Sequence, residues 1–131
     1  MTAGPTYESL DPVRFIGNHS TGKMGYAIAE ALANEGAEVE LVSGPTPLTV
    51  NHPQIRVTRV VSAEEMYQAC LLKFNSTEIT ILSAAVADYK PVHTAEQKIK
   101  KSASEMTVEL TQTRDIATEL GKQKVQLSPM N

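Results

Sequence analysis

The chain has 131 residues, enough for one domain with a hydrophobic core. Its composition is that of an ordinary globular protein, with 41% hydrophobic residues, 21% charged residues and a net charge of −3. This mildly acidic balance gives no electrostatic basis for binding nucleic acid or an anionic membrane. No apolar run approaches the roughly 18 residues of a membrane span, and the N-terminal residues lack the pattern of a secretory signal. The single cysteine, Cys70, fits a reducing compartment, so we expect a cytoplasmic protein.

Both ends of the sequence are unusual for a complete domain. The turn-like residues 3–6 normally follow a buried strand, but almost nothing precedes them. The last residues are polar and include Pro129, with no apolar segment to close a sheet. We therefore expect a fold that is incomplete at both ends.

The first predicted helix follows a long opening loop. Ser20 or Thr21 is suited to cap its start, and Gly36 to end it in a left-handed conformation. Apolar side chains recur in between at the spacing of one helical face, at Met24, Ala27, Ile28, Ala31 and Leu32.

Two strands and a second helix come next. Residues 37–44 alternate apolar and acidic side chains and end in a Gly-Pro-rich turn, which indicates a strand. Residues 55–61 are β-branched and alternating, so they predict another strand. Ser62 and Glu65 have the spacing of a capping box and predict the start of a helix.

The remaining elements complete an α/β pattern. A continuous apolar run at residues 79–87 predicts a strand buried on both faces. Residues 106–112 alternate and predict a strand, and residues 113–122 predict a short helix closed by Gly121. Strands that alternate with helices predict a Rossmann-like, three-layer α/β fold with a mostly parallel sheet.

Ligands of such folds bind beyond the carboxyl ends of the strands. The loops that we expect there are residues 4–25, 43–47 and 83–101.

The stretch RFIGNHSTGKMG, residues 14–25, could cradle an anion. It precedes a helix N-terminus, where free N–H groups and the helix dipole favour negative charge. Gly22 and Gly25 permit close approach of a phosphate, and Ser20 and Lys23 could add a hydroxyl and a charge. The stretch is neither a P-loop, since Met24 stands where Ser or Thr should be, nor G-x-G-x-x-G. Anion binding and a simple capped turn both remain open.

Three further features carry possible chemistry, each with a structural alternative. The Asn18 amide could donate to a developing oxyanion, or Asn18 could simply occupy a left-handed turn. Ser83, Ala84, Ala85 and Asp88 could line a nucleotide, or serve helix–sheet packing and capping. The KIKK run at residues 98–101 could fold over a site, or be solvated surface. These residues alone leave two classes open: a nucleotide-using ligase or transferase, and a dinucleotide-dependent oxidoreductase.

The combination of motifs is more specific than any one of them. TAGPTYESLDPVRFIGNHSTGKMG, then VSGPT, SAAVADYKP, KIKK and TRDIATELG follow one another in the chain. In this order they resemble the phosphopantothenate–cysteine ligase domain of bacterial coenzyme A biosynthesis. The resemblance covers residues 1–124, and residues 125–131 are a polar tail without a match.

The resemblance implies a two-step ligase. CTP and Mg²⁺ activate the carboxylate of 4′-phosphopantothenate as an acyl-cytidylate with release of pyrophosphate, and the amine of L-cysteine then displaces CMP. Members of the family have a Rossmann-like fold and commonly form homodimers. Many are fused behind a flavin-dependent decarboxylase domain, a possible partner that would hold the FMN and that is absent from this sequence.

The same resemblance implies roles for individual residues. Asn18 and Lys98 are the expected catalytic residues: Asn18 holds the activated acyl group, and Lys98 belongs to a mobile loop that closes over the intermediate. Arg14, Ala84 and Ala85 join Asn18 in binding the substrate. The nucleotide-binding positions are Gly4, Ser20, Gly22, Gly25, Ser83, Ala84, Asp88, Lys98, Arg114 and Asp115. No residue is assigned to the metal.

The sequence departs from the family pattern in its second half. Arg114 stands where the family often has Pro, and the family's Gly-Phe-Ala-Xaa-Glu-Thr segment is missing. We therefore expect an intact acyl-substrate loop but a partial nucleotide site. Two alternatives are an NAD(P)-binding oxidoreductase module, which lacks its usual motifs here, and a non-catalytic partner of a full-length ligase.

Overall fold

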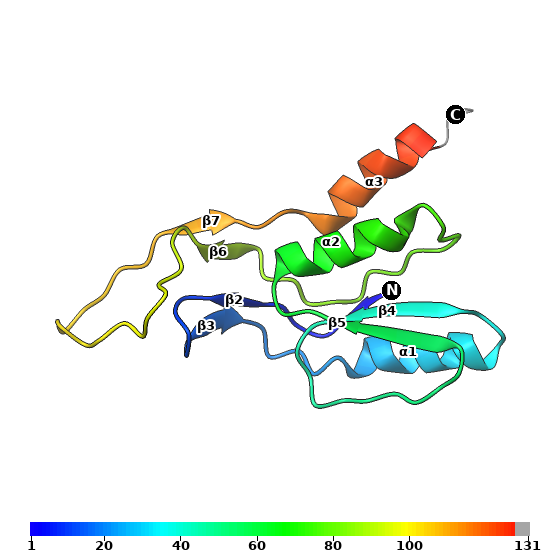
Figure 1. Cartoon of the computed structure of the whole chain (residues 1–131), viewed down its shortest axis with the longest axis horizontal. Helices are drawn as coiled ribbons and strands as arrows, with labels where there is room; N and C mark the ends of the chain where they lie inside the picture. Colours follow the sequence, from blue (N-terminus) through cyan, green and yellow to red (C-terminus); the bar gives the residue numbers. More distant parts are fainter. Residues whose placement is uncertain (128–131) are drawn as a thin grey trace.

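A computed structural model describes residues 1–127 (Figure 1). Its central sheet has three parallel strands in the order β1-β4-β5. Residues 82–85 extend this sheet on the other side of β1, through parallel bridges from Leu82 to Thr2 and from Ala85 to Pro5. The bounds of these strands are Thr2–Ala3 for β1, Val39–Ser43 for β4 and Ile55–Arg59 for β5.

Helices cover both faces of this sheet. Helix α1 (Lys23–Asn34) packs on one face, and α2 (Ala63–Phe74) and α3 (Ile116–Leu127) lie on the other (Figure 1). Leu41 joins the core under α1, whereas its neighbour Val42 joins the core under α2 and α3, because adjacent strand residues face opposite ways. The predicted three-layer α/β fold with a mostly parallel sheet is confirmed.

The capping box at the start of α2 is also confirmed. Ser62 Oγ accepts a hydrogen bond from the N–H of Glu65 at 3.2 Å, and Glu65 Oε1 accepts one from the N–H of Ser62 at 3.2 Å. The buried carboxylate of Glu8 adds a third acceptor, for the N–H of Ala63 at 3.0 Å. Three of the unpaired donors of this helix end are thus satisfied by side chains.

Helix α1 differs from the prediction in its cap and its buried face. Neither Ser20 nor Thr21 is the N-cap: that residue is Gly22, with φ of 83° and no side-chain cap. Met24 is 66% exposed, and the buried side of the helix is instead Gly25, Tyr26, Ala29 and Ala33. The cause is a close helix–sheet contact, since a Cβ on Gly25 would lie 2.4 Å from the Cβ of Ala3. The predicted stop at Gly36 is confirmed by its φ of 99°.

The prediction of a doubly buried strand at residues 79–87 is wrong. Only one edge of this segment pairs, through bonds such as Thr2 N–H to Ile81 O at 3.0 Å and Ala85 N–H to Gly4 O at 2.8 Å. Ile79 is 74% exposed and Leu82 is 41% exposed. Within residues 1–127 no strand lies on the other edge, so the apolar run is not enclosed.

Helix α3 continues through Gly121 to Leu127, so the predicted stop at Gly121 is wrong. Gly121 has a negative φ and lies in open space, where helical backbone needs no left-handed residue. The helix includes residues 125–127 of the predicted tail, and residues 128–131 lie outside the described part of the chain.

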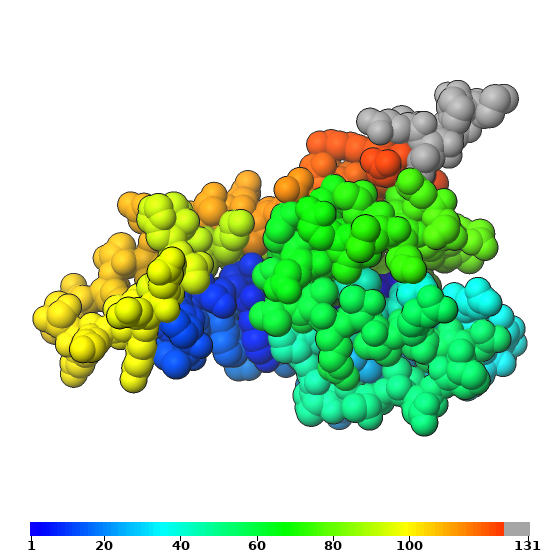
Figure 2. Space-filling model, viewed as in Figure 1, coloured from blue at the N-terminus to red at the C-terminus, as the bar shows by residue number. Residues whose placement is uncertain are grey.

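Two antiparallel hairpins form an arm that the sequence did not predict. Strands β2 (Tyr7–Ser9) and β3 (Phe15–Gly17) form one hairpin, and β6 (Tyr89–Pro91) and β7 (Leu110–Gln112) the other. The predicted strand at residues 106–112 is therefore shorter and lies outside the central sheet. Figures 1 and 2 show the arm projecting beside the helices and the parallel sheet.

Two glycine substitutions should have opposite effects on stability. Gly25→Ala should lower the free energy of unfolding by about 1–3 kcal/mol, because its Cβ would overlap Ala3. Gly121→Ala should raise it by about 0.5–1 kcal/mol, since a Cβ there meets nothing within 4 Å and alanine favours a helix. Urea denaturation of both variants and the unsubstituted chain measures the effects. Equal effects of the two substitutions would contradict the close contact between α1 and β1.

Candidate functional site

Three glycine-containing turns meet at the carboxyl ends of β1 and β4. Gly4 follows β1 with φ of 79°, and a Cβ on Gly22 would lie 3.3 Å from the Cα of Gly4. Gly44 follows β4, and a Cβ there would overlap the carbonyl oxygen of Pro5. Backbone therefore packs directly on backbone, which side chains at these positions would prevent. We call the surface formed by Gly4, Gly22 and Gly44 the glycine cradle.

The N-terminus of α1 opens at this cradle. The N–H groups of Gly22 and Lys23 donate to Ser20 Oγ and Thr21 Oγ1, each at 3.3 Å. The first turn carries no acidic residue, and Lys23 is its first residue. The positive end of the helix dipole is thus uncompensated by protein charge, which favours an anionic ligand.

A threonine that the sequence analysis did not select joins a third loop to the cradle. Thr46 Oγ1 donates to the carbonyl oxygen of Thr21 at 2.7 Å, directly before Gly22. Arg59 holds the same loop by donating to the carbonyl oxygens of Thr46, at 3.1 Å, and Leu48, at 2.6 Å. The loop at residues 43–47 was expected near a ligand, but nothing in the sequence singled out Thr46.

Asn18 lies against the segment that extends the central sheet. Its Nδ2 donates to the carbonyl oxygen of Ala85 at 3.0 Å, and that oxygen also accepts the N–H of Thr6 at 3.2 Å. Asn18 is itself exposed, so its amide is fixed at one end and open to solvent. The amide therefore stands where a ligand placed along residues 83–85 would meet it.

Ser83 and Ala84 continue the same surface towards the helix. Ser83 Oγ donates to the carbonyl oxygen of Thr2 at 2.6 Å, and the N–H of Ala84 donates to Thr2 Oγ1 at 3.3 Å. A Cβ on Gly25 would lie 2.8 Å from Ser83 Oγ, so the helix start and this segment touch. The structure thus brings together many of the expected positions: Gly4, Asn18, Ser20, Gly22, Gly25, Ser83, Ala84 and Ala85.

Other expected site residues make their contacts elsewhere. Arg114 Nε lies 3.0 Å from Glu64 Oε1, and its guanidinium lies 4.7 Å from the centre of the Tyr67 ring, both on α2. Asp115 Oδ1 accepts the N–H of Thr118 at 3.1 Å, at the start of α3. Asp88 has an exposed side chain between the central sheet and the arm.

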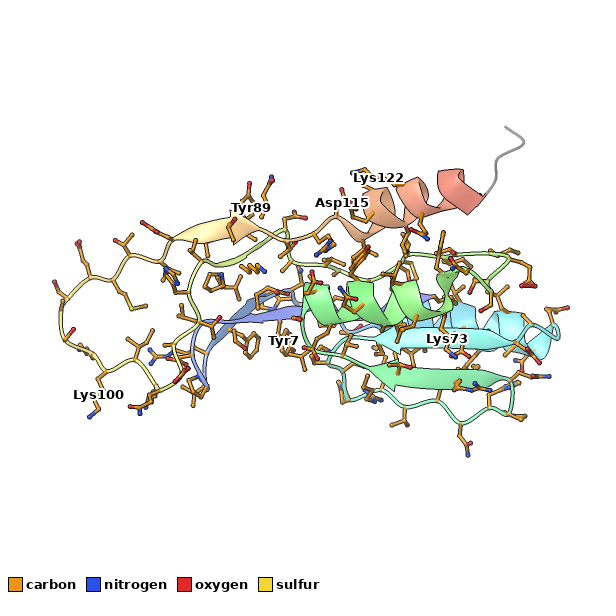
Figure 3. All side chains as sticks on the ribbon, turned by 45° about the horizontal axis from the view of Figure 1, so that its top comes forward. Tyr7, Lys73, Tyr89, Lys100, Asp115 and Lys122 are labelled. Atoms are coloured by element: carbon orange, nitrogen blue, oxygen red, sulfur yellow. The ribbon has the colours of Figure 1, made fainter. Side chains whose placement is uncertain are left out.

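Lys98 lies on the exposed loop of the arm, which we define as residues 92–109 and call the arm loop. Figure 3 labels Lys100 near the tip of this loop, far from α1. The glycine cradle and Lys98 therefore belong to separate parts of the molecule in this conformation.

Arg14 and Asp11 form the best-defined charged pair. Arg14 Nη2 lies 2.9 Å from Asp11 Oδ2, and the Asp11 side chain is fully buried. Burial opposes its ionisation, but hydrogen bonds from the N–H groups of Ile99, Val13 and Arg14, together with the guanidinium charge, lower the pKa of Asp11 to about 2. Arg14 was predicted from the sequence as a site residue, but its partner Asp11 was not.

The stabilising contribution of Asp11 should disappear in acid. Its folded pKa of about 2 lies below the ordinary value of 3.8, so the contribution is complete above about pH 4 and is lost as the pH falls towards 2. Asp11→Asn removes this titration. The difference in free energy of unfolding between the two proteins should therefore shrink from pH 5 to pH 2 in urea denaturation. A difference that is constant over this range would contradict an ionised, hydrogen-bonded Asp11.

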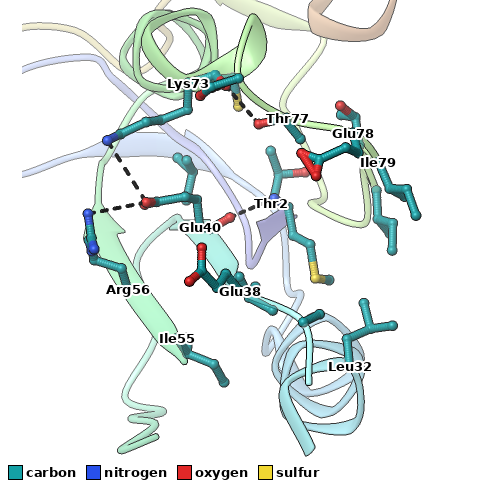
Figure 4. A pocket seen from close by; sticks show the side chains of 18 of the residues that line it. Thr2, Leu32, Glu38, Glu40, Ile55, Arg56, Lys73, Thr77, Glu78 and Ile79 are labelled. Carbon is teal, nitrogen blue, oxygen red and sulfur yellow. Dashed lines mark hydrogen bonds and ion pairs between the residues drawn. The ribbon is translucent and has the colours of Figure 1, made fainter. Parts of the chain in front are cut away.

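A cavity of about 810 Å³ lies at the opposite end of the sheet (Figure 4). Residues near the amino ends of the strands line this cavity. Among them, Glu40 Oε1 lies 3.5 Å from Arg56 Nη1 and 3.9 Å from Lys73 Nζ. Ligands of parallel α/β sheets bind beyond the carboxyl ends instead. We therefore place the candidate site at the glycine cradle and not in this cavity.

Comparison with known proteins identifies the family. A family model described as the DNA/pantothenate metabolism flavoprotein C-terminal domain matches residues 1–128. The chain belongs to this family. The resemblance to the coenzyme A biosynthesis domain is thereby confirmed.

Relatives with names from coenzyme A biosynthesis match over most of the chain. The coenzyme A biosynthesis bifunctional protein CoaBC of Haemophilus influenzae is 51% identical over 124 residues, which are 95% of this chain and 31% of that protein. The CoaBC protein of Bacillus subtilis is 48% identical, over 95% of this chain and 30% of that protein. A protein of an unknown prokaryotic organism, named cysteine/cysteine sulfinic acid decarboxylase, is also 51% identical, over 95% of this chain and 34% of that protein. The chain thus spans about a third of each relative.

Solved structures confirm the fold. The crystal structure of the C-terminal domain of CoaBC has a TM-score of 0.80 and 45% identity, covering 94% of this chain and 57% of that chain. The DNA/pantothenate metabolism flavoprotein of Streptococcus pneumoniae has a TM-score of 0.81 and 26% identity, covering 92% of this chain and 62% of that chain. Among residues 1–127, no helix is long and apolar enough to cross a membrane.

Proposed function

We propose that this chain carries the acyl-activating part of a phosphopantothenate–cysteine ligase, with CTP as the activating nucleotide. The observation that supports this most directly is the meeting of Asn18 with residues 83–85 beside the glycine cradle. A helix start suited to an anion and a side-chain amide lie on one surface, which supports this assignment. Membership of the family and the names of the CoaBC relatives support the assignment to coenzyme A biosynthesis.

In this proposal the glycine cradle binds the nucleotide, and the Asn18 amide acts on the acyl group. The N-terminus of α1 holds the phosphates of CTP, and the carboxylate of 4′-phosphopantothenate attacks the α-phosphorus, forming acyl-cytidylate and releasing pyrophosphate. The amine of cysteine then attacks the acyl carbon, and CMP leaves with the electrons of the broken bond. The amide of Asn18 donates to the oxygen that gains negative charge in that step.

Magnesium would enter with the nucleotide. The described residues contain no cluster of three His, Cys, Asp or Glu side chains that could hold an ion. Mg²⁺ needs no such cage, because it usually takes one or two carboxylates together with the phosphates of its substrate. The exposed carboxylate of Asp88 could supply such a ligand at the end of the sheet segment.

Two other functions have less support. An NAD(P)-dependent oxidoreductase has less support because the sequence contains neither G-x-G-x-x-G nor a tyrosine followed four residues later by lysine. The decarboxylase name belongs to a relative of which this chain matches 34%, so the matched part need not be the decarboxylating part.

The first test looks for the intermediate. The chain is incubated with 4′-phosphopantothenate, CTP and Mg²⁺ without cysteine, and mass spectrometry detects 4′-phosphopantothenoyl-CMP. We expect the intermediate, with the full-length Haemophilus influenzae relative as the positive control. If only the control forms it, the catalytic proposal is contradicted, and co-purification with a full-length ligase would then favour the non-catalytic partner.

A second test addresses the expected catalytic residues. With cysteine present, Asn18→Asp should slow the second step by about 10²–10³-fold, the loss typical of an oxyanion donor. Asn75→Asp is a matched control, since Asn75 is an exposed residue at the end of α2. Lys98→Gln should reduce the amount of intermediate. The rate of the second step is measured in both variants by quenching the reaction at set times. Equal rates for Asn18→Asp and Asn75→Asp would contradict a role of Asn18 in the mechanism.

A further inference from the structure

Two side chains of the first hairpin hold the backbone N–H and carbonyl of one residue of the arm loop. The N–H of Ile99 donates to Asp11 Oδ2 at 3.0 Å, and the carbonyl oxygen of Ile99 accepts a hydrogen bond from Arg14 Nη2. The donors and acceptors are 85 and 88 residues apart in the chain. We call this arrangement of Asp11, Arg14 and the Ile99 backbone the clamp.

Contacts within its own hairpin turn hold the Asp11 carboxylate in place. Its Oδ1 accepts the N–H groups of Val13 at 2.9 Å and Arg14 at 2.8 Å, within the turn between β2 and β3. The Arg14 guanidinium lies on Oδ2, the same oxygen that receives Ile99. A carboxylate with all these donors stays ionised and has little freedom to turn.

The clamp is the outermost attachment on the first half of the arm loop. Nearer the central sheet, Thr94 Oγ1 donates to the carbonyl oxygen of Ser9 at 3.1 Å. The N–H of Ala95 donates to the carbonyl oxygen of Leu10 at 3.0 Å. Beyond Ile99, residues 100–107 are all exposed, and Lys100 lies out towards the tip in Figure 3. The clamp therefore separates a held part of the loop from a free part.

Lys98 immediately precedes the clamped residue. Consecutive Cα atoms are about 3.8 Å apart, so fixing the Ile99 backbone restricts the path of Lys98 as well. We propose that Asp11 and Arg14 are positioning residues, which set the place of Lys98 by binding the backbone of Ile99. This inference rests on the proposed function, in which Lys98 is needed to form the intermediate.

The clamp itself is tested without any substrate. By hydrogen exchange and NMR, the amide of Ile99 should exchange at least tenfold more slowly than the amides of Lys98 and Lys100, after correction for intrinsic rates. The clamp supplies this protection, since neither neighbour is held by such a bond. Exchange of Ile99 as fast as its two neighbours would overturn the clamp.

A carboxylate-to-amide variant tests which side chain is responsible. Asp11→Asn keeps an oxygen for the turn but loses the charge and the acceptor for Ile99, so trypsin should cut after Lys98 at least tenfold faster. Cutting after Lys101 is the internal standard, and Glu119→Gln is the matched control, on an exposed pair with Lys122. Cleavage after Lys73, inside α2, reports global unfolding; if it rises too, the exchange result for the unsubstituted chain decides. A normal rate after Lys98 in a folded Asp11→Asn variant would overturn the proposal.

A double-variant assay connects the clamp to Lys98. If Asp11 acts through Lys98, the variant that combines Asp11→Asn with Lys98→Gln should form the intermediate no more slowly than Lys98→Gln alone, although Asp11→Asn alone is slow. Multiplied effects would show that Asp11 acts independently of Lys98 and overturn the positioning role. If the unsubstituted chain forms no intermediate, the proposed function fails, while exchange and cleavage still decide the clamp.

Discussion

The close approach of α1 to β1 determines the arrangement of the candidate site. Gly25 packs over Ala3, and Gly22 packs over Gly4, so the helix start lies directly on the end of the central strand. A longer side chain at either glycine would push the helix away from the sheet and move its free N–H groups with it. The same contact brings Gly25 against Ser83 and thus aligns the helix with the segment that Asn18 binds. Close packing and the candidate anion-binding surface therefore depend on the same few residues.

Local patterns predicted the parts of the fold that depend on local interactions. The capping box at Ser62 and the stop at Gly36 could be read because the interacting groups lie a few residues apart. The buried face of α1 could not be read, because only the close contact with β1 selects the small Gly25, and not Met24, to face the sheet. The hairpins were missed since β2, β3 and β6 have only three residues each, too few to show a period, and the predicted strand at residues 106–112 did not reveal its partner. For residues 79–87 the composition was read correctly as apolar, but burial depends on neighbours that composition does not reveal.

The candidate site shows the same division between local and distant information. Motif resemblance named Gly4, Asn18 and Ser83, which the parallel sheet brings together as its topology requires. Arg114 is not brought to this surface, because its guanidinium contacts Glu64 and Tyr67 on α2. Reaching a nucleotide would require breaking that ion pair, and an exposed pair of this kind is worth only about 0–1 kcal/mol. Its present contacts are thus a weak restraint on movement, whereas the clamp on Ile99 combines a buried carboxylate with several donors.

The buried carboxylate of Asp11 also restricts the path of the arm loop. Removing Asp11 from water is unfavourable, but the bonds from Val13, Arg14 and Ile99 outweigh that cost for the ionised form, since its pKa is lowered. Two of these partners are local and form with the turn itself, but Ile99 must come from the far end of the chain. The carboxylate is therefore fully satisfied only when the arm loop follows one path, and any other path leaves a buried acceptor without its donor. Among residues 1–124, whose side chains the structure describes, no buried side-chain polar atom is left without a partner, so the described fold meets this condition.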